Sequence, residues 1–437
     1  MLRSRSESDL TAGRPQVFYG WTVLIVAAAA MVGTLPGRTQ GLGLITEPLL
    51  ADLGLDRVTY ATLNFWATIT GAVGALGIGR LIDRFGSRVV LVCLSLSLGG
   101  VVCAMSQVAS MSALAVWLTL TRALGQSALS VVSLAMVGHW FVRRIDTAMA
   151  AYSIAMSVGF MAAFPLVGFA VQRFGWRPTW LAVGAAVAAG LAPAAWLLVR
   201  RSPEACGLHP DGDAAEPGAR AGVIDAELDV PGYTWTDALS TPAFWTFAVG
   251  AALYGLVASG IGLFNESILA ERGLGPSVYY RSLVVTAMAA LAGNFLGGWL
   301  ATRMPLTRLL AISLGILTAG LAVIPHIVLP WQVAIWATAM GLGGGLVMVL
   351  FFSVWPRVYG RRHLGQIQGL AQAVTVLASA LGPLLLAWCV TWTGSYAAMF
   401  RLLAGAMALA AAAGLLVSLP APRPQAADLR ADSSLPA

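Results

Sequence analysis

Charged residues are scarce in this sequence, in which Asp, Glu, Lys and Arg make up only 10% of 437 residues. A soluble domain carries about a quarter, so this scarcity excludes an ordinary soluble protein. Lysine is absent, and all 26 basic residues are arginine. Basic residues accumulate in the cytoplasmic loops of membrane proteins. The net charge of +7 is therefore best explained by topology, and we expect no nucleic-acid partner.

Motifs of catalysis and metal binding are also missing. The four cysteines (Cys93, Cys103, Cys206 and Cys389) lack the CxxC or CxxH spacing of a metal site and do not form a disulfide framework. No Walker A, GxSxG, HExxH or haem-attachment motif occurs. The sequence predicts no catalytic residue, no metal and no cofactor, so we do not expect an enzyme.

Long apolar runs are abundant, and 58% of the residues are hydrophobic. A transmembrane helix needs roughly 20 apolar residues. Runs of about that length cover residues 18–46, 58–80, 89–107, 112–141, 147–171, 177–199, 242–268, 276–302, 307–327, 331–356, 364–389 and 396–420. We predict an all-α, multi-pass membrane protein with twelve transmembrane helices.

The runs fall into two sets of six. We expect an N-terminal tail (1–17), a first six-helix bundle (18–199), a polar linker (200–241), a second six-helix bundle (242–420) and a disordered tail (421–437). The halves also echo each other, because GRLIDR at 79–84 ends the second run and GWLATR at 298–303 ends the eighth. Such pseudo-repeats are typical of transporters with a central site.

Arginine positions predict the orientation. Eighteen arginines lie in segments on the side of the two termini, and six lie on the other side, namely Arg38, Arg57, Arg173, Arg177, Arg272 and Arg281. Since arginine is enriched on the cytoplasmic side, we expect both termini in the cytoplasm and the protein in the inner (plasma) membrane.

The loop after the second run has a recognisable pattern, GRLIDRFGSR at residues 79–88. Its spacing G-x-L-x-D-R-x-G-x-R resembles the loop 2–3 signature of the major facilitator superfamily, with Ser87 where the family usually has a basic residue. LTRALGQSALSV at 120–131 resembles the superfamily's intramembrane arginine motif. The flanks FYGWTVLIVAAA, HWFVRRIDTAMA, RFGWRPTW and YGRRHLGQIQGLAQA resemble its bacterial monocarboxylate and oxalate/formate-type branch.

This resemblance implies a mechanism and a gate. Two bundles would rock about a central cavity, and the loop would form the cytoplasmic gate through Gly79, Asp83, Arg84, Gly86 and Arg88. Asp83 would be a conformational latch. Arg84 and Arg88 also suit anchoring on the inner side, and Gly86 permits a sharp reversal of the chain.

Arg122 is the clearest charge inside the membrane. It lies about ten residues into the fourth run, roughly 15 Å deep, and Gln126 follows one helical turn later on the same face. A buried arginine is costly and normally faces a cavity or a partner. Arg122 and Gln126 are candidate substrate-binding residues; the alternative for Arg122 is a structural clasp to a neighbouring helix.

Arg38 is a second candidate. A straight helix from Phe18 would carry it about 30 Å, near the outer boundary. Pro36 and Gly37 would loosen the helix there, and LPGRTQG resembles the place in the first span where monocarboxylate carriers keep a basic residue. A guanidinium can clamp a carboxylate with two hydrogen bonds. The alternative is an ordinary arginine of an outer loop.

The second half offers polar candidates without charge. The branch often carries a basic residue within span 8, but this sequence has only Asn294 in that interior. Gln368 and Gln372 share one face of the eleventh run. Glu266 and Glu47, near the outer ends of their runs, are weaker candidates for proton coupling, and an interfacial position is their alternative.

These observations predict a monomeric secondary transporter of a small organic anion such as a monocarboxylate. It would work in the lipid bilayer by proton symport or anion exchange. The alternatives are an efflux transporter of amphipathic compounds, for which Arg38 would be dispensable, and a sensor or scaffold that keeps the fold without transport.

Overall fold

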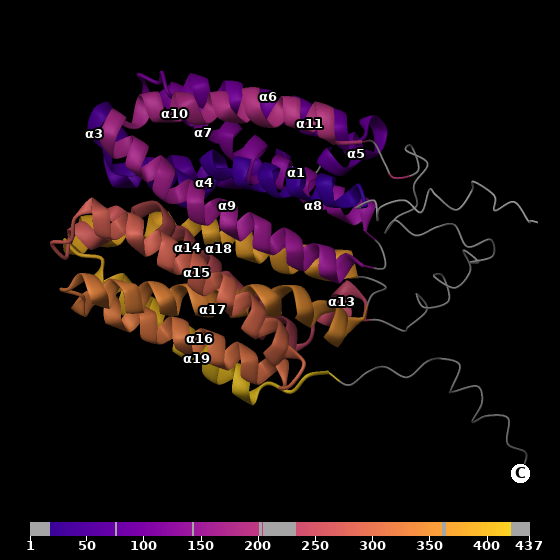
Figure 1. Ribbon diagram of the computed structural model, residues 1–437. Helices are drawn as coiled ribbons and strands as arrows, with labels where there is room; N and C mark the ends of the chain where they lie inside the picture. The colour runs from indigo at the N-terminus through magenta and orange to yellow at the C-terminus, as the bar shows by residue number, and fades with distance from the viewer. Residues whose placement is uncertain are drawn as a thin grey trace, which may run out of the picture.

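The computed structural model describes residues 18–74, 77–141, 144–200, 203, 233–360 and 364–420, and every regular element there is helical (Figure 1). The helices of the first half are α1 (Gly20–Gly33), α2 (Thr39–Gly43), α3 (Thr46–Leu53), α4 (Arg57–Gly74), α5 (Ile78–Phe85), α6 (Ser87–Met105), α7 (Met111–Thr121), α8 (Ser130–Trp140), α9 (Ile145–Phe174), α10 (Trp176–Ala186) and α11 (Ala192–Leu198). Those of the second half are α13 (Trp235–Leu239), α14 (Pro242–Ala270), α15 (Pro276–Ala301), α16 (Leu306–Val323), α17 (Pro330–Tyr359), α18 (Leu364–Thr393) and α19 (Ala397–Leu416).

Membrane-spanning helices dominate the described residues. Eleven helical stretches there are long and apolar enough to cross a bilayer. The remaining predicted span, 58–80, corresponds to α4 and α5, and α4 is less apolar because it carries Asn64 and four threonines (Thr59, Thr62, Thr68 and Thr70). The prediction of an all-α, multi-pass membrane fold is confirmed.

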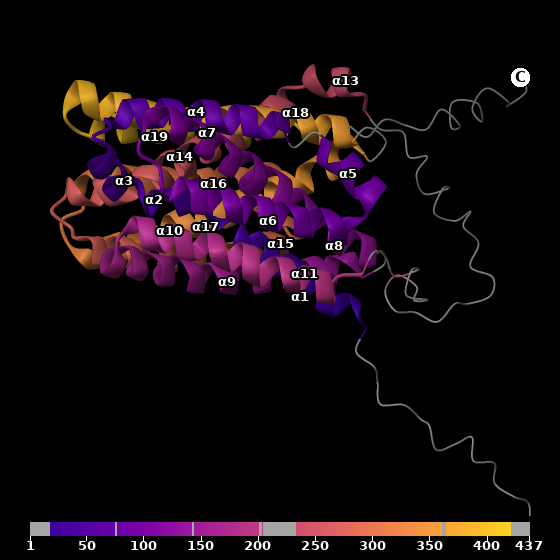
Figure 2. The ribbon, with the colours of Figure 1, turned by 90° about the horizontal axis from the view of Figure 1, so that it is seen from above.

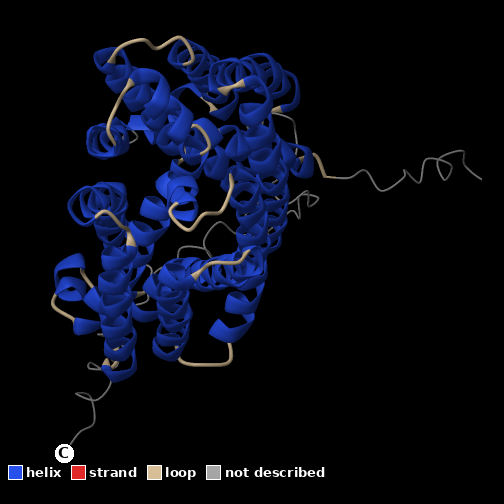
Figure 3. Ribbon diagram, turned by 90° about the vertical axis from the view of Figure 1, so that its left-hand side faces the viewer, coloured by secondary structure: helices blue, strands red, loops and turns tan. Residues whose placement is uncertain are grey.

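The helices form two layers, one from each half of the chain (Figure 1). Figure 2 looks down on the first half from above. In the first half α6 packs on α10, and α1 packs on α8 and α9. In the second half α14 packs on α18, α15 on α17, and α16 on α19. The halves meet where α4 contacts α18, α9 contacts α15, and α2 contacts α14. Figure 3 looks along the helices and shows the short loops that join them.

The two ends of the molecule can be told apart by their elements. We call the near end the one at which α1 begins and α11 and α17 end; there the Tyr19 hydroxyl donates to the Leu198 carbonyl over 2.8 Å. The far end carries α3 and the turns after α9 and α14 (Figure 1). The near end is the predicted cytoplasmic side.

The first predicted span, 18–46, is broken. A single turn of 3₁₀ helix, Leu35–Gly37, follows α1, and Arg38 then adopts an extended conformation (φ −87°, ψ 151°) before α2 begins. Proline lacks a backbone N–H and cannot continue the ladder. Gly37 lies so close to the fourth span that a Cβ there would be 2.6 Å from the Thr121 carbonyl oxygen. Only glycine fits this crossing.

The fourth predicted span is also irregular. Between α7 and α8, residues Arg122–Leu129 form a π-helical segment. Such segments are rare and frequently lie at functional sites. Because the break after α1 packs against this segment, the irregular parts of the two spans are neighbours.

The segment expected to be a linker, 200–241, contains the short helix α13 in its described part. α13 begins with a capping box formed by Thr234 and Asp237, and the Tyr233 backbone N–H donates to the Tyr359 carbonyl oxygen over 3.0 Å. These contacts hold the start of the second half against the near end of α17. Residues 204–232 of the segment lie outside the described part.

Candidate functional site

A cavity of about 240 Å³ lies between the two halves. The first half contributes four polar side chains to its lining, Arg38, Thr39, Gln40 and Gln126. The second half contributes three helices, α14 (Ala251, Tyr254, Gly255, Ala258 and Ser259), α17 (Val347, Met348, Phe351 and Phe352) and α18 (Gln372, Thr375 and Ser379). A site shared by two halves of a transporter can be exposed to either side of a membrane as they move.

Arg38 reaches this cavity because the chain turns at the break after α1. Its Nε donates to the Thr34 hydroxyl over 2.6 Å, and one terminal nitrogen lies 2.7 Å from the Met31 sulfur. The guanidinium also lies over the Phe160 ring, 5.2 Å from its centroid. These contacts orient a half-buried cation without neutralising it.

Arg122 lies one layer behind the cavity wall and is 2% exposed. Its guanidinium donates to Asn64 Oδ1 through two nitrogens, one of them at 3.1 Å. It also donates to the Thr39 hydroxyl at 2.9 Å and to Gln126 Oε1 at 2.5 Å. Thr39 and Gln126 line the cavity. Arg122 therefore fixes two lining side chains rather than lining the cavity itself.

Neither arginine has an acidic partner among the described residues. The ion pairs found there are Arg57–Glu47, Arg177–Asp52 and Arg272–Glu271, all away from the cavity. A buried charge that is not paired is expensive. Two positive charges therefore lie at one cavity with no described carboxylate to balance them.

The wall from the second half is partly apolar. Met348, Phe351 and Phe352 of α17 present carbon atoms, while Gln372 and Thr375 of α18 present polar groups one turn apart. The α17 wall approaches α14 closely, because a Cβ on Gly344 would lie 2.3 Å from the Tyr254 hydroxyl. The cavity combines a cationic side with an aromatic side.

The remaining binding candidates lie outside the cavity lining. Gln368 is one turn from Gln372, closer to the near end. Asn294 lies where α15 packs on α17, because a Cβ on Gly345 would come within 2.8 Å of its backbone nitrogen. Sequence reasoning missed Gln40 and Tyr254; Gln40 was signalled only by its position two residues after Arg38.

Glu47 and Glu266 meet at the far end from opposite halves. Glu47 Oε2 accepts a hydrogen bond from Arg57 at 2.7 Å, whereas Glu47 Oε1 and Glu266 Oε2 are buried without a hydrogen-bond partner among the described residues. The two carboxylates are close enough to interact electrostatically. Arg57 is ion-paired with Glu47, and a crevice of about 520 Å³ adjoins this pair.

Asp56 starts α4 beside this crevice. The Thr59 hydroxyl donates to Asp56 Oδ2 at 2.5 Å, and the Thr59 backbone N–H donates to Oδ1 at 2.9 Å. These hydrogen bonds hold the pKa of the Asp56 carboxyl below its usual range. Asp56 therefore stays ionised at neutral pH and caps the helix that carries Arg57.

The halves are in close contact at the far end. A Cβ on Gly43 of α2 would lie 2.1 Å from the Gly262 carbonyl oxygen of α14, and a Cβ on Gly168 of α9 would lie 2.2 Å from the Tyr280 ring of α15. Backbone and ring contacts of this kind leave no room for a passage at these points. The structure is therefore closed between these helices at the far end.

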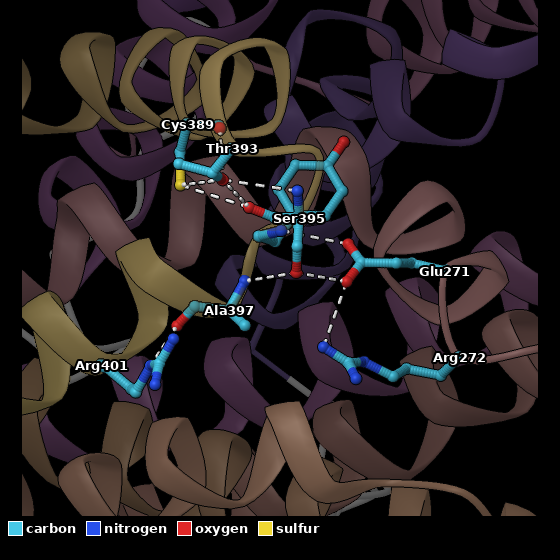
Figure 4. A network of polar contacts seen from close by, with 8 residues as sticks. Glu271, Arg272, Cys389, Thr393, Ser395, Ala397 and Arg401 are labelled. Atoms are coloured by element: carbon cyan, nitrogen blue, oxygen red, sulfur yellow. Dashed lines mark hydrogen bonds and ion pairs between the residues drawn. The ribbon is translucent and has the colours of Figure 1, made fainter.

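A polar network braces the far end of the second half (Figure 4). Glu271, at the end of α14, accepts from the Ser395 hydroxyl at 2.6 Å and from the Tyr396 backbone N–H at 3.1 Å, and it pairs with Arg272. Burial raises the pKa of the Tyr396 hydroxyl. The network ties the loop after α14 to the loop before α19.

The predicted gate loop joins α5 to α6. Gly86 has φ 80° and makes the reversal, Arg84 stacks on Phe85, and Arg88 lies over the Trp196 ring at 4.2 Å. The side chain of Asp83 and the surroundings of Gly79 lie outside the described part of the structure. The latch role of Asp83 stays a prediction.

One family model matches almost the whole chain in two overlapping parts. The model of the Major Facilitator Superfamily matches residues 17–337 and, in a second overlapping match, residues 250–436. Monocarboxylate transporter 13 of Bos taurus is 27% identical over 297 residues, and that of Rattus norvegicus is 31% identical over 140 residues. These matches cover 66% and 32% of this chain, and only 63% and 32% of the relatives' own lengths.

Solved structures show the same fold. A bacterial homologue of the human lysosomal transporter Spinster, inward-facing and unoccupied, has a TM-score of 0.68 and 18% identity, with 94% of this chain and all of that chain covered. The same homologue in an inward-facing, occupied form has a TM-score of 0.64 and 16% identity, covering 93% of this chain and 97% of the other.

Proposed function

Because the chain belongs to the major facilitator superfamily, we propose that it is a secondary active transporter that moves a small organic anion by alternating access. The two halves, 18–199 and 242–420, would rock about the cavity, with 200–241 as the connection. The arginine distribution supports cytoplasmic termini and a plasma-membrane location. Asp83 would latch the near end when that side closes.

The observation that carries this proposal is the cavity with two unpaired cations. Arg38 lines the cavity and Arg122 lies directly behind it, and neither has a carboxylate partner among the described residues. A carboxylate substrate would supply the missing negative charge and accept two hydrogen bonds from the Arg38 fork. A bound carboxylate would therefore balance the positive charge of the site.

The shape of the cavity supports a monocarboxylate with an apolar body. A carboxylate on Arg38 would direct the rest of the molecule toward Phe351, Phe352 and Met348. The volume of about 240 Å³ suits a small compound. A second carboxylate would lie against this apolar wall without a cation, and burying it there would be unfavourable. The name printed for the bovine relative, a monocarboxylate transporter, agrees with this choice.

Uptake into proteoliposomes tests the substrate class. We expect monocarboxylates with an apolar body to be taken up about tenfold faster than dicarboxylates of equal length. This ratio corresponds to a difference of about 1.4 kcal/mol in the activation free energy of transport. The assay compares an inward proton gradient with counterflow. Equal rates for both classes, or no uptake of any carboxylate, would contradict the proposal, and uptake that is independent of Arg38 would favour efflux of amphipathic compounds instead.

We also propose that Glu266 and Glu47 couple transport to protons. They interact across the far end, and Arg57 is ion-paired with Glu47 while Glu266 has no ion pair with a described residue. Two carboxylates that interact in this way favour protonation of one of them. Closure of the far end would therefore take up a proton, and its opening would release it.

Glu266→Gln tests the coupling. Glutamine removes the second negative charge, so we expect the variant to lose the stimulation by an inward proton gradient and to keep counterflow exchange. Glu271→Gln is the matched control, because Glu271 lies in the same turn region but is held by Ser395 and Tyr396. An unchanged response of Glu266→Gln to the gradient would show that the proton binds elsewhere.

A further inference from the structure

An apolar groove on the lipid-facing side of the first half has no role in the proposed transport cycle. Its volume is about 650 Å³, and it is separate from the cavity between the halves. The floor comes from α1 and the following turn (Ala29 to Pro36), one wall from α9 (Ala163 to Phe174) and the other from α10 and α11 (Pro178 to Ala194). Leu166 and Phe174 are 69% and 66% exposed and stand along the α9 wall.

The groove is open toward the bilayer. Ala182, Ala186 and Gly190 line it and are exposed, and a Cβ on Gly190 would meet no atom within 4 Å. No larger side chain of this part of the chain fills the space. The groove runs alongside α10 and α11 from Pro178 to Ala194, a helix length of about 24 Å. This length exceeds the depth of about 15 Å of one half of the hydrocarbon core.

The lining offers almost no polar surface to a ligand. The hydroxyl of Thr179, which lines the groove, already donates to the Gly175 carbonyl oxygen at 2.8 Å. The body of any occupant must therefore be apolar along its whole length. An acyl chain meets this condition, whereas a water-soluble substrate does not.

An exposed cation lies on α9 next to Phe174, the last α9 residue of the groove lining. Arg173 is exposed, has no hydrogen bond or ion pair with any described residue, and follows Leu166 and Ala170 along one face of α9. The neighbouring Arg177, by contrast, is paired with Asp52 at 2.8 Å. Arg173 is thus placed at the depth of the lipid headgroups, where a phosphate would meet it.

We propose that this groove binds an anionic phospholipid, with one acyl chain along α10 and α11 and its phosphate on Arg173. The lipid would fill the gap between α9 and α10 at the end where α9 also packs on α15 of the second half. A bound lipid would stabilise the first half by mass action. The proposal does not depend on the identity of the transported substrate.

Lipid binding to the full chain in detergent tests the proposal. Phosphatidylglycerol and phosphatidylcholine with the same acyl chains are titrated while native mass spectrometry counts bound lipid and the unfolding temperature is followed. We expect phosphatidylglycerol to bind more tightly and to raise the unfolding temperature. Ala186→Leu and Gly190→Leu, which fill the groove from an exposed position, should abolish both effects. Ala185→Leu, on the same helix but outside the groove lining, should keep them.

The headgroup contact has its own variant. Arg173→Gln should reduce the preference for phosphatidylglycerol by about fivefold, as expected for one basic residue near an anionic surface. Arg281→Gln, an exposed arginine of the far end without a described partner, should leave the preference unchanged. The proposal is overturned if Ala186→Leu and Gly190→Leu bind phosphatidylglycerol normally, or if soluble glycerol phosphate binds as well as the lipid. It is also overturned if the groove is an interface between two copies of this chain, which would show as a dimer that Ala186→Leu disrupts.

Discussion

Arg38→Gln is expected to weaken binding of the transported carboxylate by roughly 30-fold or more, because removing one member of a buried, hydrogen-bonded charge pair costs about 2 kcal/mol at least. Arg38 lines the cavity, donates to Thr34 and Met31, and lies over the Phe160 ring. The Thr34 hydroxyl also donates to the Met31 carbonyl oxygen at 2.6 Å. Loss of the guanidinium therefore leaves few groups without a partner, and the unfolding temperature should change little.

The ligand-induced rise of the unfolding temperature measures this effect for the carboxylate with the fastest uptake. Arg38→Lys keeps the charge but loses the planar fork, so it should bind more tightly than Arg38→Gln and less tightly than the parent. Arg281→Gln again serves as the control, because it removes an exposed arginine away from the cavity. If Arg38→Gln retains full binding and full uptake, the cation of the site is not Arg38, and the proposed substrate pose is wrong.

The overall fold could be predicted from the sequence because the bilayer sets a simple length rule. Each crossing helix must satisfy its own backbone hydrogen bonds over about 20 apolar residues. This rule gives the all-α, multi-pass fold that the structure and the family comparison confirm. The length rule fails locally at α4, which carries polar residues such as Asn64. Asn64 has a role inside the protein, since it accepts a hydrogen bond from Arg122.

The position of Arg38 could not be predicted from helix geometry alone. A continuous helix places it near the bilayer surface, but the chain turns after Gly37 and brings Arg38 to the cavity. That turn depends on the fit of Gly37 against Thr121 and Gln126, residues more than eighty positions away. A local pattern carries no information about such a contact.

The lining of the second half could be predicted only in part, for a related reason. Gln368 and Gln372 share a helix face, yet only Gln372 lines the cavity. The rotation and tilt of α14 and α18 are set where Gly255 meets Ser379 and where Gly260 meets Gly382. Tyr254 enters the lining through this packing, and in the sequence nothing sets it apart from the four other aromatic residues of the run 242–268.

Arg122→Met is expected to destabilise the fold, in contrast to Arg38→Gln. Its removal strands Asn64 Oδ1 and Gln126 Oε1, which both accept from the buried guanidinium. Each buried acceptor without a partner costs about 1–3 kcal/mol. We expect a loss of about 3 kcal/mol in the free energy of unfolding, visible as a large drop in the unfolding temperature, together with loss of transport.

A second substitution separates the structural role of Arg122 from its electrostatic role. Replacing both partners of a buried hydrogen bond by apolar groups can be nearly neutral, so Arg122→Met combined with Asn64→Leu should regain much of the lost stability. The double variant still lacks the positive charge behind Thr39 and Gln126. We therefore expect it to fold but to bind the carboxylate more weakly than the parent, since a low-dielectric wall transmits the field of a nearby charge strongly. Normal transport by a stable double variant would make Arg122 a structural clasp only, and would leave Arg38 as the one cation that attracts the substrate.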